Sequence, residues 1–171
     1  MTAEKRTSPS SPVGGLRQVL TFSLGTEQYG VDILRVQEIR GWSPVTKLPK
    51  VPPHVLGVLN LRGTIVPIID LRVRFNLPSA DFTPLTVIVV LSVEFAAGSR
   101  EFGVVVDGVS DVIDIAADHL KKTPSLGSPA TAEFVHGLAV VGERMLILLN
   151  VDELLRRDME QVAADDLPSV A

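Results

Sequence analysis

The sequence contains no cysteine, few aromatic residues and no long apolar run, and each absence excludes a class of protein. Without cysteine there is neither a disulfide framework nor a thiolate metal site, which is compatible with a reducing cytoplasm. The longest apolar runs, Val87 to Leu91 and Met145 to Leu149, are far shorter than the roughly 18 residues that a membrane-spanning helix needs. We therefore expect no direct insertion into a membrane.

Charge and composition further limit the possible partners and the fold class of the protein. Sixteen basic against twenty acidic residues give a formal net charge of −4, and no basic cluster marks a nucleic-acid footprint, so nucleic acid is not an expected partner. Aromatic residues make up 5% of the 171 residues and hydrophobic residues 46%, which leaves the core to Val, Ile and Leu and favours strands. The first 15 residues lack the apolar core of a secretory signal, and we expect a disordered tail over residues 1–17.

Motifs for catalysis and metal binding are missing as well. The three histidines, His54, His119 and His136, have no ligand spacing, and the spaced aspartates after residue 106 fit no calcium loop. No nucleophile motif, phosphate loop or dinucleotide fingerprint occurs. We predict a protein that is not an enzyme and has no metal or cofactor. The alternative from another class is a small-molecule-binding barrel or a hydrolase that uses Asp70 or Asp107.

Short apolar runs separated by Gly-rich turns predict about ten strands and one terminal helix. Hairpins are expected over Gln18–Ile33 and over Gly57–Leu71, and Thr86 to Phe95 is so uniformly apolar that it should form a central, buried strand. The terminal helix is expected over Val151–Val162, with Asp152 as its N-cap. Further strands are expected over residues 36–39, 101–115, 134–141 and 144–151. This pattern favours all-β barrels over a parallel sheet.

The sequence also contains an internal repeat. The tripeptide at 29–31 matches that at 102–104, a shift of 73 residues (30 to 103), and at this shift Val36 falls on Val109 and Glu38 on Asp111. A second shift of 80 residues (57 to 137) places the Gly57 hairpin on residues 137–151. We infer two related half-units, each a small five-stranded barrel, which must pack together or exchange strands to bury enough surface.

Arg62 is the charged residue that interrupts the otherwise apolar Gly57 hairpin. Its counterpart at the shift of 80 residues is Gly142, so the fold does not require an arginine at this turn. We interpret Arg62 as a residue kept for a partner. The groove between the two half-units is the expected binding surface.

Several motifs together resemble the CheW family of chemotaxis coupling proteins. They are FSLGTEQYGVDI, VQEIRGW, the proline-rich loop at 48–53, GVLNLRGTIVPIIDLR, VVVDGVSDV and RMLILLNVDELL, and the match runs from about Val19 to Leu155. The resemblance implies two intertwined five-stranded SH3-like barrels, related by the internal repeat, with a C-terminal helix. It places the CheW-like domain at residues 18–155 and leaves 156–171 as the end of the helix and a tail.

The resemblance also implies a function and partners. It implies a cytoplasmic, non-enzymatic scaffold that couples the signalling tips of chemoreceptors to the regulatory domain of the histidine kinase CheA, in receptor arrays at the inner membrane. An adaptor in a related array of another pathway, such as surface motility, is the alternative.

The resemblance further implies where the partners bind. The receptor site would consist of aliphatic groove residues and two polar contacts, namely Leu20, Val31, Leu34, Val36 and Val109 with Glu38 and Arg62. Because a receptor tip is a helical hairpin, an aliphatic groove would fit one apolar face of a helix. The kinase contact is expected only as a region of the second barrel, around the strands after Thr86 and the Leu138–Leu148 hairpin.

Overall fold

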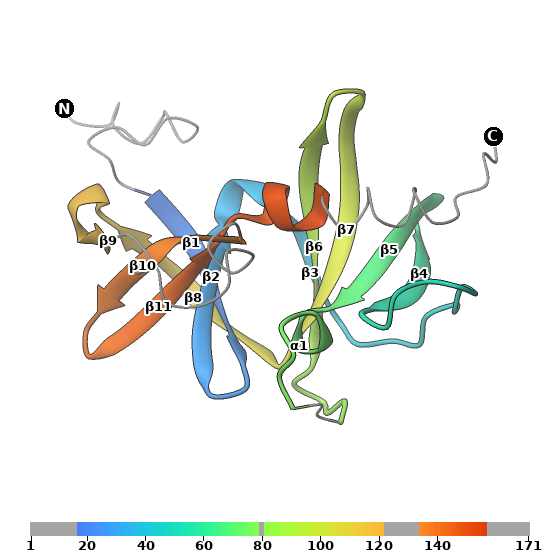
Figure 1. The fold of residues 1–171 in the computed structure, drawn as a ribbon, viewed down its shortest axis with the longest axis horizontal. Helices are drawn as coiled ribbons and strands as arrows, with labels where there is room; N and C mark the ends of the chain where they lie inside the picture. The colour runs from blue at the N-terminus through green and yellow to red at the C-terminus, as the bar shows by residue number, and fades with distance from the viewer. Residues whose placement is uncertain (1–16, 79–80, 122–133, 157–171) are drawn as a thin grey trace.

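A computed structural model describes residues 17–78, 81–121 and 134–156, and in this part of the chain eleven strands form two sheets, which appear as two lobes in Figure 1. The strands are β1 (Arg17–Leu24), β2 (Glu27–Asp32), β3 (Val36–Gly41), β4 (Val55–Leu61), β5 (Thr64–Asp70), β6 (Val87–Phe95), β7 (Gly98–Val106), β8 (Gly108–Ile115), β9 (Leu120–Lys121), β10 (Val135–Val141) and β11 (Arg144–Leu149). The helical segments are α1 (Leu71–Arg74), two 3-10 turns, η3 (Ile33–Arg35) and η4 (Ala117–His119), and a helix over residues 151–156. The expected all-β fold with two barrels is confirmed; the short strand β9 was not predicted.

Each sheet combines strands from both half-units. The six-stranded sheet has the order β8-β1-β2-β11-β10-β9, and the five-stranded sheet has the order β3-β6-β7-β5-β4. In both sheets the first hairpin of one half-unit lies between the third and the last strand of the other: β1–β2 lies between β8 and β11, and β6–β7 lies between β3 and β5. The half-units therefore exchange strands, and neither closes a barrel by itself.

Two matched glycines allow this exchange. The parallel pairing of β11 with β2 places Leu148 opposite Gly30, and the pairing of β5 with β7 places Ile68 opposite Gly103. A Cβ atom on Gly30 would lie 3.0 Å from Cδ2 of Leu148, and one on Gly103 would lie 2.6 Å from Cδ1 of Ile68. The absence of a side chain at these two glycines thus leaves space for Leu148 and Ile68, which are matched positions on the two exchanged strands.

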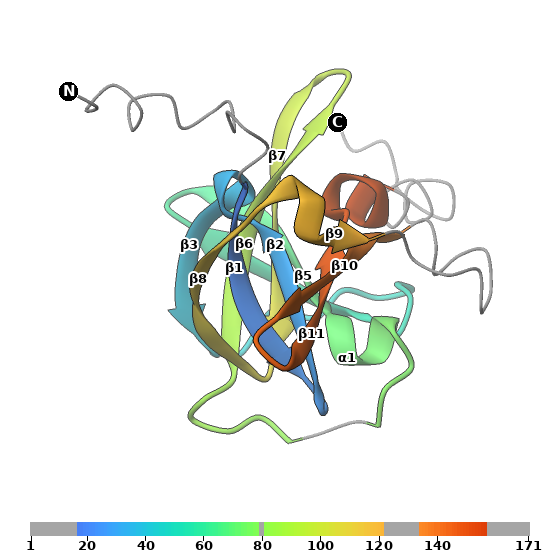
Figure 2. The same ribbon diagram turned by 90° about the vertical axis from the view of Figure 1, so that its left-hand side faces the viewer.

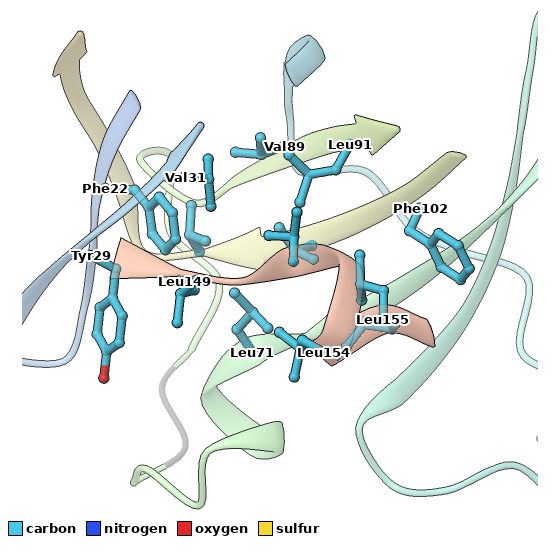
Figure 3. Packing of buried hydrophobic residues seen from close by; sticks show 14 of the residues in the cluster. Phe22, Tyr29, Val31, Leu71, Val89, Leu91, Phe102, Leu149, Leu154 and Leu155 are labelled. Atoms are coloured by element: carbon cyan, nitrogen blue, oxygen red, sulfur yellow. The ribbon is translucent and has the colours of Figure 1, made fainter. Parts of the chain in front are cut away.

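The largest core cluster lies between the barrels and draws on both sheets. Phe22 and Val31 come from the six-stranded sheet, Leu91 and Phe102 come from the five-stranded sheet, and all four are buried (Figure 3). The helix over residues 151–156 covers this cluster with two fully buried leucines and lies between the two lobes in Figure 1. The prediction of a central, buried strand after Thr86 is confirmed, because β6 lies between β3 and β7.

The start of the terminal helix differs from the expectation. The helix begins at residue 151, and Oδ1 of Asn150 accepts a hydrogen bond from the N–H of Glu153 at 3.2 Å. Asn150 is therefore the N-cap. Asp152 already lies within the helix, where its carboxylate forms an ion pair with Arg35.

Several expectations fall outside the described residues. They are residues 1–16 of the disordered tail expected over residues 1–17, and the end of the terminal helix with the tail beyond residue 156. The last residue of the expected N-terminal tail, Arg17, instead begins β1. Among the residues that are described, no helix is long and apolar enough to cross a membrane.

Candidate protein-binding site

The predicted receptor site lies where the chain crosses from one barrel to the other. Val36 begins β3 and Val109 lies near the start of β8, and these are edge strands of different sheets. Both strands run along the left side of the molecule in Figure 2. Both valines are half-buried, and both pack against the core cluster between the barrels. The exchange of strands thus brings two matched positions of the repeat to the rim of one core.

Each valine lies beside an irregularity in strand pairing. The register of β3 against β6 shifts after Val36, and the register of β8 against β1 shifts at Val109. Such bulges change the direction of side chains on an edge strand. The equivalent placement of the two bulges indicates that both edges are built in the same way.

The other aliphatic residues of the predicted site divide by exposure. Leu20 and Val31 are cross-strand partners in β1 and β2, and each is only 2% exposed. In this conformation they lie beneath the surface and support it, so their contribution is to packing. Leu34, in the 3-10 turn η3, is 53% exposed, so its side chain is accessible to a binding partner.

Glu38 and Arg62 form an ion pair, with Nη2 of Arg62 2.8 Å from Oε1 of Glu38. Glu38 lies on β3 and Arg62 on the turn after β4, and β3 and β4 are the two edges of the five-stranded sheet. The pair therefore spans the open seam of this barrel. The hydrogen bond from Arg62 lowers the pKa of Glu38, desolvation opposes this, and a hydrogen bond from Arg40 lowers it further.

The backbone at Arg62 explains why an arginine at this turn is unusual. Arg62 has φ 54° and its counterpart Gly142 has φ 65°, so both hairpins need a left-handed residue at this position. Glycine adopts this conformation without strain and arginine does not. Asp111, the counterpart of Glu38, instead accepts a hydrogen bond from the Thr21 hydroxyl at 3.2 Å. The repeat thus keeps the turn in both barrels but the arginine in only one.

The region expected to contact the kinase is divided by the exchange of strands. Strands β6 and β7 belong to the five-stranded sheet, and β10–β11 belong to the six-stranded sheet, so the expected region extends over both sheets. Strand β6 presents few side chains because most of it is buried, whereas the β10–β11 hairpin exposes Val140, Val141 and Met145. Alternation within β11, with Met145 exposed and Leu146 buried, is the signal that could have identified this tip.

Arg72 joins two carboxylates in a buried cluster that sequence reasoning missed. Its Nε and Nη2 atoms each lie 3.0 Å from an oxygen of Asp70, and its Nη1 lies 3.2 Å from Oδ1 of Asp107. The hydrogen bond with Asp70 raises the pKa of Arg72. Asp107 lies between β7 and β8, and the crossover at this point places its carboxylate against α1.

The same cluster bears on the alternative of a hydrolase or small-molecule-binding barrel. The carboxylates of Asp70 and Asp107 are both engaged by Arg72. A depression of about 180 Å³, whose lining includes Arg17 and Asp32, contains neither of these carboxylates and no residue of the predicted receptor site. The geometry therefore gives no support to chemistry at Asp70 or Asp107.

Comparison with known proteins agrees with this architecture. The model of the CheW-like domain family matches residues 18–159. The chain is 46% identical over 139 residues to the chemotaxis protein CheW of Klebsiella aerogenes, with 81% of each chain covered. It is 35% identical over 149 residues to the probable chemotaxis protein CheW of Rhizobium etli, covering 87% of this chain and 94% of the other. The crystal structure of the scaffolding protein TtCheW from Thermoanaerobacter tengcongensis is similar, with a TM-score of 0.71, 32% identity and coverage of 78% and 88%. The chain therefore belongs to the CheW-like domain family.

Proposed function

We propose that this chain is a non-enzymatic adaptor that couples the cytoplasmic signalling tips of chemoreceptors to the regulatory domain of the histidine kinase CheA, in arrays at the inner membrane. Its membership of the CheW-like family, with relatives named as chemotaxis and scaffolding proteins, supports an adaptor in chemotaxis. The observation that carries the receptor assignment is the convergence of Val36 and Val109 at the rim of one core.

The features around this rim support a helical partner. Leu34 adds an exposed aliphatic side chain, and the Glu38–Arg62 pair adds charge beside it. One apolar face of a helix, flanked by polar residues, would fit such a surface. For the kinase, the exposed tip of β10–β11 with Met145 is the favoured contact.

A binding assay with purified components tests the proposal. Immobilised chain is expected to retain both a chemoreceptor signalling domain and the CheA regulatory domain. Retention of neither would refute the adaptor function. Retention of the kinase domain alone would refute the receptor assignment, because the chain would then be shown to be folded and competent to bind.

We expect Leu34→Asp to weaken receptor binding by about tenfold or more, because a buried aliphatic contact contributes about 1.5–3 kcal/mol and a carboxylate would have to be desolvated. Folding should be unaffected, since Leu34 is exposed in the free chain. Titration of labelled receptor domain measures the effect. Met145→Asp is the matched control at an equally exposed position; it should keep receptor binding and lose kinase binding. Equal losses of both partners in both variants would contradict the two assignments.

We expect Arg62→Ala to leave the melting temperature nearly unchanged and to weaken receptor binding. The reason is that an ion pair at the surface, in which Arg62 is exposed, contributes little net stability in water, while the charge beside the receptor surface is lost. Thermal unfolding and the same titration measure the two effects. Arg62→Gly removes the same charge and copies Gly142 without backbone strain, so it should be at least as stable as Arg62→Ala. A marked drop in melting temperature for Arg62→Gly would instead make the pair a structural requirement.

A further inference from the structure

Two ion pairs of opposite polarity join the half-units. Arg72, in α1 of the first half-unit, contacts Asp107 at the β7–β8 crossover of the second, with 3.2 Å between Nη1 and Oδ1. Asp152, in the helix of the second half-unit, contacts Arg35 at the β2–β3 crossover of the first, with 2.6 Å between Oδ2 and Nη2. Position 72 falls on 152 at the shift of 80 residues, and position 35 falls one residue from 107 at the shift of 73.

The surroundings of the two pairs are also equivalent. The backbone N–H of Gly25 donates to Oδ2 of Asp107 at 2.7 Å, and the backbone N–H of Glu94 donates to Oδ1 of Asp152 at 3.4 Å. Each donor belongs to the half-unit that supplies the helix of that pair. In both barrels a helix, a crossover and a hairpin therefore meet at one point, with the charges of helix and crossover reversed.

The two donors occupy equivalent positions relative to the strand register of the two hairpins, although the shift of 73 residues places Gly25 on Gly98. The first hairpin pairs Phe22 with Tyr29, and its counterpart pairs Leu91 with Phe102. Both donors stand three residues after the first member of these cross-strand pairs. The equivalence of the two ion-pair sites thus rests on strand register as well as on sequence matching.

Because the two ion pairs have opposite polarity, they favour the combination of a first with a second half-unit. Two first half-units exchanging strands would place Arg72 against Arg35, with Asp70 as the remaining carboxylate beside Arg72. Two second half-units would place Asp152 against Asp107, with the carboxylate that now lies 3.9 Å from Arg35, Glu94, beside them. A first and a second half-unit place opposite charges together at both sites. Like charges across an interface suppress the wrong partner.

Partial burial limits how far water can relieve the repulsion between like charges at these sites. The side chain of Arg72 is 3% exposed, and those of Arg35, Asp107 and Asp152 are each less than a third exposed. Charges in such positions are screened only weakly by salt.

We propose that the two inverted ion pairs are a pairing code, which makes each half-unit combine with the unlike half-unit and prevents a second copy of the chain from pairing through like half-units.

A full-length variant with Arg35→Glu and Asp152→Arg tests the code. Within one chain both pairs stay complementary, so the variant should fold. Each half-unit, however, now carries one acidic and one basic member and becomes complementary to itself. We expect the fraction of chains that refold from denaturant as dimers, measured by size-exclusion chromatography with light scattering over a range of concentrations, to rise by about tenfold over wild type. A dimer fraction equal to that of wild type would overturn the proposal.

A matched control separates the code from a general effect of moving charges. Glu153→Arg with Arg156→Glu inverts an ion pair of 3.8 Å in the same helix, and both members belong to one half-unit. This variant should refold as wild type does, and an equal rise in dimers would overturn the proposal. If the test variant does not fold, Arg35→Gln with Asp152→Asn removes the repulsion at both like pairings without adding attraction. We expect an intermediate dimer fraction for it, and a wild-type fraction would again refute the code.

Discussion

Arg72→Ala is expected to lower the free energy of unfolding by about 3–5 kcal/mol, because removing one partner of a buried ion pair leaves the other charges uncompensated. Asp70 is buried with Arg72, and its carboxylate would lose two hydrogen bonds. Asp107 would lose its side-chain partner at the crossover between barrels. For a chain of this size the melting temperature should fall by about 10 °C. Chemical denaturation and thermal unfolding measure both quantities.

The control for this prediction is an arginine without such surroundings. Arg100 lies near the start of β7, and its side chain is exposed to solvent. Arg100→Ala therefore truncates the same type of side chain at an exposed position. Its free energy of unfolding should change by no more than about 0.5 kcal/mol. If the two variants unfolded alike, the cluster around Arg72 would not hold the barrels together.

Gly57→Ala is expected to cost about 3 kcal/mol of stability, because it combines backbone strain with a clash against backbone. Gly57 has φ 150°, and a Cβ atom there would lie 2.1 Å from the carbonyl oxygen of Thr46. Thr46 is held at this position by two hydrogen bonds with Val58, of 3.0 and 2.9 Å. The loop before β4 would have to leave the strand. A denaturant titration measures the loss.

Two other glycines calibrate this effect. A Cβ atom on Gly41 would have no neighbour within 4 Å, so Gly41→Ala should be close to neutral. The repeat counterpart Gly137 would bring a Cβ atom 2.9 Å from the carbonyl oxygen of Lys121, and its substitution should have an intermediate cost. If Gly57→Ala were as stable as Gly41→Ala, the loop at Thr46 would be shown to move freely.

Local signals in the sequence were sufficient to find most strands. The predicted hairpins at Gln18–Ile33 and Gly57–Leu71 correspond to β1–β2 and β4–β5, because period-two alternation and glycine at the turn are properties of neighbouring residues. The short strand β9 carries too few residues for such a pattern. The N-cap was misplaced by two residues, since Asn150 and Asp152 are both good caps and only the helix start distinguishes them.

The candidate site depended on contacts that no local pattern encodes. The repeat matched Val36 with Val109, but only the crossovers bring them to the same core. Leu20 and Val31 look like Leu34 in the sequence, yet tertiary packing buries the first two and exposes the third. The receptor role of these residues stays a prediction, and the structure indicates which of them can be tested without disturbing the fold.

The sequence by itself determined the all-β class, the two half-units and the turn at which Arg62 replaces glycine, because periodicity and backbone conformation are local properties. It left open whether the half-units pack side by side or exchange strands. Only the tertiary structure decided this, through the parallel pairing of β11 with β2 and of β5 with β7. It also decided which charges meet: Arg62 with Glu38 across a barrel seam, and Arg72 with Asp107 at a crossover. The members of such pairs are distant in sequence, and the type of a charged residue does not specify which oppositely charged residue it will contact.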